Sequence, residues 1–281
     1  MAKTKWNLLF ATFVLSGLSL ATLIVSFCTQ HWVVSEASEV TAYRNSEIHY
    51  GLFAGSLTRN VLATPVGLDL TVICMYEYNA CVYSCQKDEA KREIELQDMM
   101  NGRKPAECPI TSSHLQSKII PSSVRYASPR AASKDAFIDA SLWLTTVILL
   151  GIATAFAGAS GSFSIINVMF NPVEPIFSVF GLYIWNAIVI ISTLLTMIIW
   201  GALFGSSLVK NIAITDTLTP EAPYSSTGLA ALGASYWLLF LPMLFHAVNT
   251  GLLLWRQYLI NREPPPTTID VDRSDLTIIM Y

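Results

Sequence analysis

Four of the five cysteines lie in one hydrophilic segment, where an even set can form disulfides. An even number of cysteines in one segment is typical of an oxidising compartment. Four cysteines allow three pairings, and the sequence does not choose among them. The alternative is a metal site, because two of the cysteines have ligand spacing, but His49 and His114 are too scattered to complete it. We therefore expect disulfides, and neither a metal nor another cofactor, among Cys74, Cys81, Cys85 and Cys108.

A second set of candidates lies inside long apolar stretches. His246 and Asn249 are three residues apart, so they share one face of a helix. Asn186 lies in another apolar stretch. Ionisable residues within a membrane span are functional candidates, here for a permeation or proton path. The alternative is hydrogen bonding between helices, worth about 1 kcal/mol per bond. A channel would need polar residues on several helices that face one lumen. We favour packing, because the first two stretches supply only Ser and Thr.

Other chemistry is not indicated by the sequence. No Ser/His/Asp set, pair of acids or phosphate-binding loop occurs near a span end in a recognisable arrangement. We expect the protein not to be an enzyme and to have no nucleic-acid partner. Asn79-Ala80-Cys81 is a weak glycosylation site.

The elements that position these residues follow from where charge is missing. Only 13% of the residues are charged, against about 25% in a soluble domain. Four charge-free stretches each supply the roughly 20 apolar residues that a helix needs to cross a bilayer. The bilayer core offers no water, so the backbone N–H and C=O groups must bond to each other, as they do in a helix. A cleaved signal peptide is the alternative for the first. We predict spans at 8–28, 140–164, 176–204 and 229–255.

Charges beside the spans predict the orientation. Lys3 and Lys5 precede the first span, and Arg256 and Arg262 follow the last. Positive residues near span ends are retained in the cytosol. We therefore expect 1–7, 165–175 and 256–281 to be cytosolic, and 29–139 and 205–228 to be extracellular, in a plasma-membrane protein that also passes through or resides in ER or endosomal membranes.

The first loop has a pattern of its own. Residues 68–78 alternate with period two, which predicts a strand, and Tyr43–Phe53 is the predicted partner strand. Gln86–Met100 is predicted to be a short helix. The predicted fold is an all-α transmembrane four-helix bundle with a small extracellular β-containing domain in the first loop.

Small residues and the tail suggest contacts. Small side chains spaced four apart let helices approach closely, which applies to Gly151 with Ala155 and to Gly201 with Gly205. A free apolar C-terminus can add as a strand to a PDZ-type groove, and the alternative is an unstructured end. The candidate ligand residues are Ile279, Met280 and Tyr281.

Several motifs resemble the clarins, four-span proteins of the wider claudin-like group. A Trp follows the first span, a Tyr-Gly-Leu-Phe segment follows it, Gly-x-x-x-Trp-Asn lies in the third span, and Ser-Tyr-Trp precedes His-Ala-Val-Asn in the fourth. The residues that carry the resemblance are Trp32, Tyr50, Gly51, Leu52, Phe53, Trp185 and Trp237, with Asn186, His246 and Asn249.

The departures from that family lie in the first loop. It is longer than in clarins and lacks their glycosylation sequon. In claudins proper, a Gly-Leu-Trp motif is closely followed by two cysteines, whereas here Phe53 ends the motif and the cysteines come much later.

The resemblance implies a non-enzymatic plasma-membrane scaffold or adaptor in sensory or neuronal cells. Its partners would be the lipid bilayer, membrane proteins in cis and a PDZ-type scaffold at the C-terminus. The alternatives are an auxiliary subunit of an ion channel and a claudin-like adhesion or barrier protein.

Overall fold

The structure is a computed structural model of the 281-residue chain. It describes residues 2–39, 45–59, 65–101, 103, 137–170, 176–210, 224–225 and 228–262.

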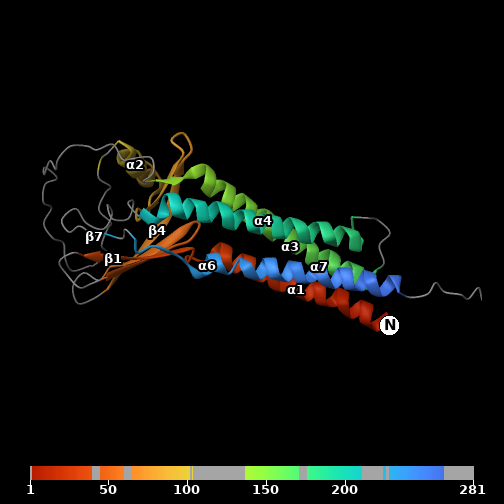
Figure 1. The fold of residues 1–281 in the computed structure, drawn as a ribbon. Coiled ribbons are helices and arrows are strands. Elements are labelled where there is room, and N and C mark those ends of the chain that lie inside the picture. The colour runs from red at the N-terminus through yellow and green to blue at the C-terminus, as the bar shows by residue number, and fades with distance from the viewer. Residues whose placement is uncertain are drawn as a thin grey trace, which may run out of the picture.

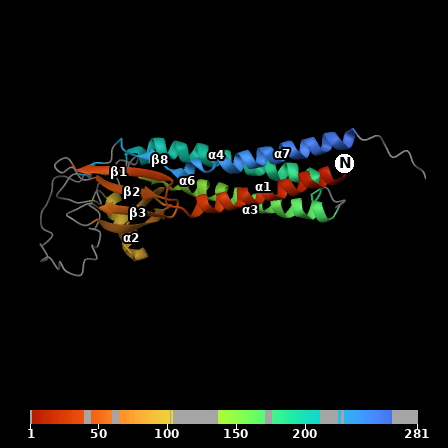
Figure 2. The same cartoon turned by 90° about the horizontal axis from the view of Figure 1, so that it is seen from below.

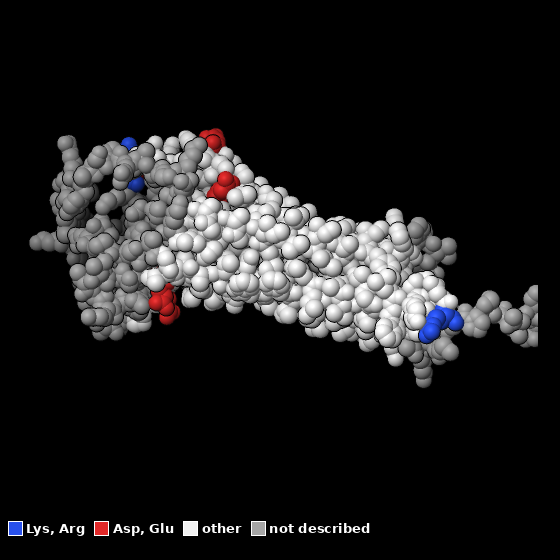
Figure 3. All heavy atoms as spheres, viewed as in Figure 1, with Lys and Arg blue, Asp and Glu red and all other residues white. Residues whose placement is uncertain are grey.

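Long apolar helices form one end of the molecule. They are α1 (Ala2–Cys28), α3 (Ala140–Met169), α4 (Val179–Ser206) and α7 (Phe240–Asn261), which the short α6 (Ala234–Trp237) precedes. Four helical segments are long and apolar enough to cross a bilayer: Trp6–Cys28, Ala140–Met169, Val179–Ser206 and Ala234–Asn261. Charged residues are absent from the visible surface of the bundle between its two ends (Figure 3). The chain is therefore a multi-pass membrane protein.

The helices run side by side away from the sheet (Figures 1 and 2). α1 packs on α3 and α7, and α4 also packs on α3 and α7. The N-terminus and the end of α7 both lie at the end of the bundle opposite the sheet (Figure 1). The fourth span is interrupted between α6 and α7. Pro242 lies in the first turn of α7, where a missing N–H leaves no helical bond unmade.

The other end of the molecule is an eight-stranded sheet. Its order is β6-β5-β4-β3-β2-β1-β7, and β8 also pairs with β1. Every pairing between described strands is antiparallel. The strands are β1 (Val33–Glu39), β2 (Asn45–Tyr50), β3 (Ala54–Arg59), β4 (Val66–Met75), β5 (Ala80–Ser84), β6 (Ile138–Asp139), β7 (Tyr224–Ser225) and β8 (Ala231–Leu232).

The predicted all-α fold class is therefore wrong. The β-structure is not a small accessory of the first loop, because β7 and β8 come from the second loop and join the same sheet. The predicted partner strand 43–53 is divided, since Asn45–Tyr50 forms β2 and the chain turns at Gly51 before β3. β4 pairs with β3 and β5 rather than with β2. The two-residue strands were too short for any periodic pattern to show them.

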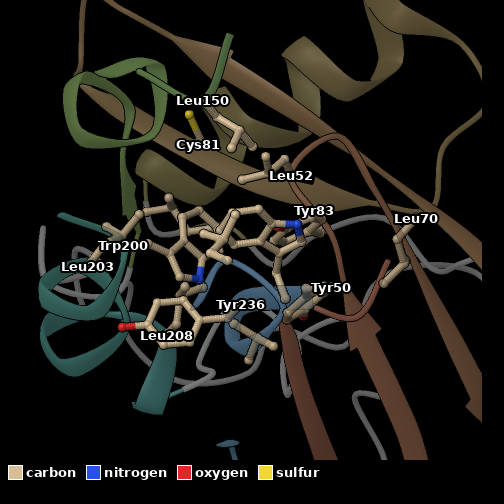
Figure 4. Close-up of a cluster of buried hydrophobic side chains, with 14 of the residues drawn as sticks. Tyr50, Leu52, Leu70, Cys81, Tyr83, Leu150, Trp200, Leu203, Leu208 and Tyr236 are labelled. Carbon is tan, nitrogen blue, oxygen red and sulfur yellow. The ribbon is translucent and has the colours of Figure 1, made fainter. Parts of the chain in front are cut away.

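One face of the sheet is buried against the bundle. Ile48 opposes Leu57, and Leu57 opposes Leu68, so one row of fully or nearly buried side chains crosses three strands. This row belongs to the same apolar cluster as Trp200 and Leu150 of the helices, shown in part in Figure 4. The bundle and the sheet therefore share one continuous core.

The helix predicted at 86–100 is α2, Glu89–Met100. Asp88 caps it by accepting a hydrogen bond from the Ala90 N–H. Leu96 and Met99 pack on Ala80 and Val82. α2 therefore covers the face of β5 that does not face the bundle.

Candidate functional site

The polar residues predicted inside the membrane meet in one place. Asn186 of α4 is the hub, and its side-chain oxygen lies 2.5 Å from Nδ1 of His246 and 3.4 Å from Nδ2 of Asn249, both on α7. The Asn186 amide nitrogen donates to the Leu182 carbonyl at 2.6 Å, which fixes its side-chain oxygen as the acceptor. All three predicted residues are fully buried or nearly so.

Hydroxyl groups extend this cluster to the other two helices. Asn249 Nδ2 donates to Ser16 Oγ of α1 at 3.0 Å. Ser16 Oγ lies 3.2 Å from Ser160 Oγ of α3, and Ser160 Oγ donates to Asn186 Oδ1 at 3.4 Å. One turn further along α1, Thr12 donates to Ser164 at 3.3 Å. We name this set the polar network; it comprises Thr12, Ser16, Ser160, Ser164, Asn186, His246 and Asn249.

Helical spacing explains why these residues converge. Thr12 and Ser16 are four apart on α1, and Ser160 and Ser164 are four apart on α3, so each pair shares a face. From the sequence, the Ser and Thr of the first two spans served only as an argument against a channel, and these four residues were not singled out. The signal that would have found them is this matched four-residue spacing on two spans.

The chemistry of the polar network is limited. It contains no carboxylate and no thiol, and its serines donate to or accept from neighbouring helices rather than an adjacent base. His246 Nε2 and Asn249 Oδ1 are buried without a hydrogen-bond partner in the described structure. Among the described residues, no three or more His, Cys, Asp or Glu side chains are grouped so that they could hold a metal ion. The arrangement is suited to joining helices.

A second set of predicted residues forms the junction between bundle and sheet. Trp32 is fully buried, its Nε1 donates to the Ser26 carbonyl at 2.7 Å, and its ring packs edge-on against Trp200 at 5.2 Å. The Tyr50 ring stacks on the Tyr83 ring at 3.9 Å. The Tyr83 hydroxyl donates to the Gly51 carbonyl at 2.5 Å.

The rest of the Gly-Leu-Phe segment faces α3. The Leu52 carbonyl accepts a hydrogen bond from Trp143 Nε1 at 2.8 Å. Leu52 itself is buried, whereas Phe53 is 41% exposed and packs against Trp143 and Phe27. Breaking the hydrogen bonds of this segment would leave buried groups without partners, which is costly. These bonds therefore hold the sheet on the bundle.

We expect Gly51→Ala to destabilise the protein by about 2–3 kcal/mol, at the upper part of the range for overpacking. A Cβ at this position would lie 2.6 Å from the Thr29 carbonyl oxygen and 2.9 Å from that of Ala54. Both obstacles are backbone atoms, so a side-chain rotation cannot relieve the clash. Gly67→Ala in β4 is the matched control, because a Cβ there meets no atom within 4 Å. Thermal unfolding of both purified variants measures the difference, and equal midpoints would contradict the packing argument.

Two other motif tryptophans lie in different surroundings. Trp185 packs against the Phe156 and Phe163 rings of α3, with its Nε1 buried and unpartnered in the described structure. Trp237 is 52% exposed. The motif therefore combines one residue of the junction, one of a helix contact and one exposed residue.

A disulfide joins the β4–β5 hairpin, as the cysteine content predicted. Cys74 and Cys81 are opposed in the strand register and are bonded to each other. Cys81 is therefore not a metal ligand. Cys85 is also disulfide-bonded, and Cys28 is free. Cys108 and His114 lie outside the described residues.

The weak glycosylation site is occupied by other contacts. Asn79 Nδ2 donates to Asp139 at 2.9 Å, and its side-chain oxygen accepts from the Ser141 N–H at 2.8 Å. Asn79 also has φ of 52°, in the left-handed region that Asn tolerates at tight turns. This side chain joins the β4–β5 turn to the start of α3.

The predicted small-residue contacts need correction. A Cβ at Gly151 or Gly205 would meet no atom within 4 Å, and Ala155 is exposed. Only Gly201 approaches another element, since a Cβ there would lie 3.3 Å from the Tyr236 hydroxyl. After its first residue, Ala140, the buried Ala, Gly and Ser residues of α3 are instead Ala153, Ala157, Ser160, Gly161 and Ser164.

A buried carboxyl group lies in the sheet region. Glu95 of α2 is 4% exposed, and one of its oxygens accepts a hydrogen bond from Ser84 while the other is unpartnered. Burial raises the pKa of Glu95 above its usual 4.5, and the Ser84 hydrogen bond opposes that shift only in part. A buried carboxyl group with a raised pKa favours the protonated form.

We expect stability to fall as pH rises above about 4.5 through the raised pKa of Glu95, because the unfolded chain loses this proton first. The folded state binds more protons in that window, so the contribution is complete below 4.5 and lost above the folded pKa. Glu95→Gln should remove this part of the slope and stabilise the protein at pH 7. Glu93→Gln, at an exposed position of the same helix, is the control. Unfolding midpoints between pH 4 and pH 8 test this, and an unchanged slope in Glu95→Gln would exclude it.

No protein-family model matches the chain, and no curated protein matches it. The predicted PDZ-ligand residues Ile279, Met280 and Tyr281 lie outside the described residues.

Proposed function

We propose that the protein is a non-enzymatic membrane scaffold or adaptor that holds its sheet on one side of a bilayer. The polar network carries this proposal, because it joins all four helices. Their polar side chains form hydrogen bonds with one another. A rigid bundle that shares its core with a large sheet is suited to presenting a surface to partners. The resemblance to clarins supports the same role in sensory or neuronal cells.

The competing function for intramembrane polar residues is permeation. A conducting path needs polar side chains that face a shared lumen. Asn186 and Ser160 instead form hydrogen bonds between helices. We expect liposomes that contain the purified protein to release no trapped ions or protons above the level of empty liposomes. Sustained flux that Asn186→Leu abolishes would replace the scaffold proposal with a transport function.

We propose a plasma-membrane location with the sheet outside and both termini in the cytosol. The Cys74–Cys81 disulfide supports this orientation, because disulfides persist outside the cytosol. The positive residues Arg256 and Arg262 at the opposite end support it too. An antibody should reach a C-terminal tag only after permeabilisation, and a tag within 117–133 without it. The opposite labelling pattern would reverse the orientation.

The proposed partners are membrane proteins in cis and a cytosolic PDZ-type scaffold. Quantitative affinity purification from sensory tissue, with the full chain and a chain that ends after Asn261, tests both. We expect the shorter chain to lose cytosolic scaffold proteins while it keeps its membrane partners. If both forms retain the same proteins at the same levels, the tail does not recruit a scaffold.

A claudin-like barrier role is the second candidate. The observation that favours it is the combination of four spans with an antiparallel sheet that contains a disulfide-bonded hairpin. Expression in an epithelial monolayer measures this role directly. A rise in transepithelial resistance would favour a barrier role. Unchanged resistance would exclude that role, and the scaffold proposal would remain.

A further inference from the structure

The end of the bundle opposite the sheet contains two hydrogen-bond donors without acceptors. Arg256 of α7 lies inside the fourth span and is partly buried, and its Nε is fully buried without a partner in the described structure. The Tyr183 hydroxyl of α4 is likewise buried and unpartnered. Tyr183 packs against a cluster that contains Leu253, and Arg256 follows Leu253 on α7 by three residues, which is about one turn. α4 and α7 pack together here through Leu182 and Leu253.

Among the described residues, no acidic side chain forms an ion pair with Arg256. The ion pair found among the described residues joins Arg103 and Asp98 in the sheet region. A partly buried guanidinium without an anion is costly. Arg262, about one and a half turns further on, does not carry this cost. It is exposed to solvent, and its guanidinium lies over the Tyr258 ring, 5.0 Å from the ring centre. Arg256 therefore needs an anion that the described chain does not provide.

The depth of Arg256 in the bilayer points to what that anion is. Trp255 and Tyr258 are exposed beside it on α7, and Trp6 is exposed near the start of α1. Exposed Trp and Tyr mark the level of the lipid headgroups. At that level the abundant anion is lipid phosphate. Arginine binds phosphate through paired N–H donors, and a Tyr hydroxyl can add a third.

The start of α4 adds to this attraction. Tyr183 lies in the second turn of α4, whose N-terminus carries the positive end of the helix dipole. The guanidinium and the hydroxyl therefore favour negative charge at one place, with the positive end of α4 one turn away.

We propose that Arg256 and Tyr183 form a binding site for the phosphate of an anionic phospholipid, between α4 and α7 in the leaflet opposite the sheet. The site depends on the membrane spans alone and not on the scaffold function. Arg256 keeps its Nε inside the protein, whereas Arg262 is exposed.

The test uses the full chain, purified in mild detergent and titrated with phosphatidylserine, phosphatidylcholine or inorganic phosphate. Native mass spectrometry measures bound lipid, and the unfolding midpoint measures the stabilisation. We expect phosphatidylserine to bind about tenfold more tightly than phosphatidylcholine, and inorganic phosphate to have no effect at equal concentration. Equal binding of the two lipids would overturn the proposal. Stabilisation by inorganic phosphate alone would reassign the site to a soluble anion and overturn it as well.

Matched variants locate the site. We expect Arg256→Gln to weaken phosphatidylserine binding about tenfold, and Tyr183→Phe to weaken it by a smaller factor. Arg262→Gln is the control, since it removes the same charge at the exposed C-cap of the same helix. Equal losses in the two Arg variants would show general surface attraction and exclude the site. If Arg256→Gln does not fold, Tyr183→Phe decides, because it removes a single oxygen atom: unchanged binding in that variant would exclude the site.

Discussion

Trp32→Ala is expected to destabilise the protein by about 3–5 kcal/mol, the usual cost of deleting a buried Trp side chain. Trp32 is fully buried where α1 passes into the sheet, and it packs edge-on against Trp200. Truncation removes this contact and leaves a cavity between bundle and sheet. It also removes the 2.7 Å hydrogen bond to the buried Ser26 carbonyl, which keeps the longer bond from the Thr29 hydroxyl at 3.3 Å. The midpoint of thermal unfolding in detergent measures the loss.

Trp237→Ala is the matched control, because it deletes the same side chain at a position that is 52% exposed. Its Nε1 donates to Leu232 at 3.3 Å, an exposed bond that contributes little. We expect a change of about 1 kcal/mol or less. Trp32→Phe should fall between the two, since it keeps most of the ring volume and loses the N–H. Equal effects of the two Ala variants would mean that Trp32 does not hold the junction.

These two tryptophans show what sequence reasoning can and cannot deliver. Both belong to the same family resemblance, and residue type does not distinguish a residue of the junction from an exposed one. The spans were predictable because missing charge over 20 or more residues has one physical explanation in a chain of this length. The sheet was underestimated because β6, β7 and β8 have two residues each and are formed by tertiary pairing rather than by local pattern.

Helix faces illustrate the same limit. Small residues four apart indicate close helix packing, but a membrane span is apolar on every side, so hydrophobicity does not reveal which face is inside. The stripe of Gly151 and Ala155 was chosen by spacing alone, and the buried stripe lies two residues away at Ala153 and Ala157. Strongly polar side chains are a better guide, because they must face a partner. That rule predicted hydrogen bonds between helices for Asn186, His246 and Asn249, and in the structure these three side chains contact one another.

The weakly polar residues reveal how the bundle is specified. Ser and Thr are tolerated anywhere in a span, since they can bond to their own helix, as Thr154 does to the Leu150 carbonyl. Ser16 and Ser160 differ from such residues because they face the amide side chains of Asn249 and Asn186. The amides therefore decide which hydroxyls become contacts between helices, and Asn186 accepts from both α3 and α7. Its removal should accordingly affect several helices at once.

We expect Asn186→Leu to destabilise the bundle by about 3–4 kcal/mol, from three lost bonds between helices at about 1 kcal/mol each and a buried imidazole left without a partner. The His246 ring would lose its 2.5 Å contact, and Ser160 Oγ would lose an acceptor. Leu has the branched shape of Asn but a larger volume, so no cavity forms and overpacking adds to the loss. Thermal unfolding in a fixed detergent measures the effect.

Thr196→Val is the control on the same helix. Thr196 is fully buried, but its hydroxyl donates to the Ser192 carbonyl of its own helix at 2.9 Å. The isosteric change removes a buried polar group without breaking a bond between helices, so we expect a change of about 0.5 kcal/mol or less. A double variant, Asn186→Leu with His246→Leu, should recover part of the loss, because no buried imidazole is then left unpaired. If the two losses simply add, the two side chains are not coupled and Asn186 is not the hub that joins α4 to α7.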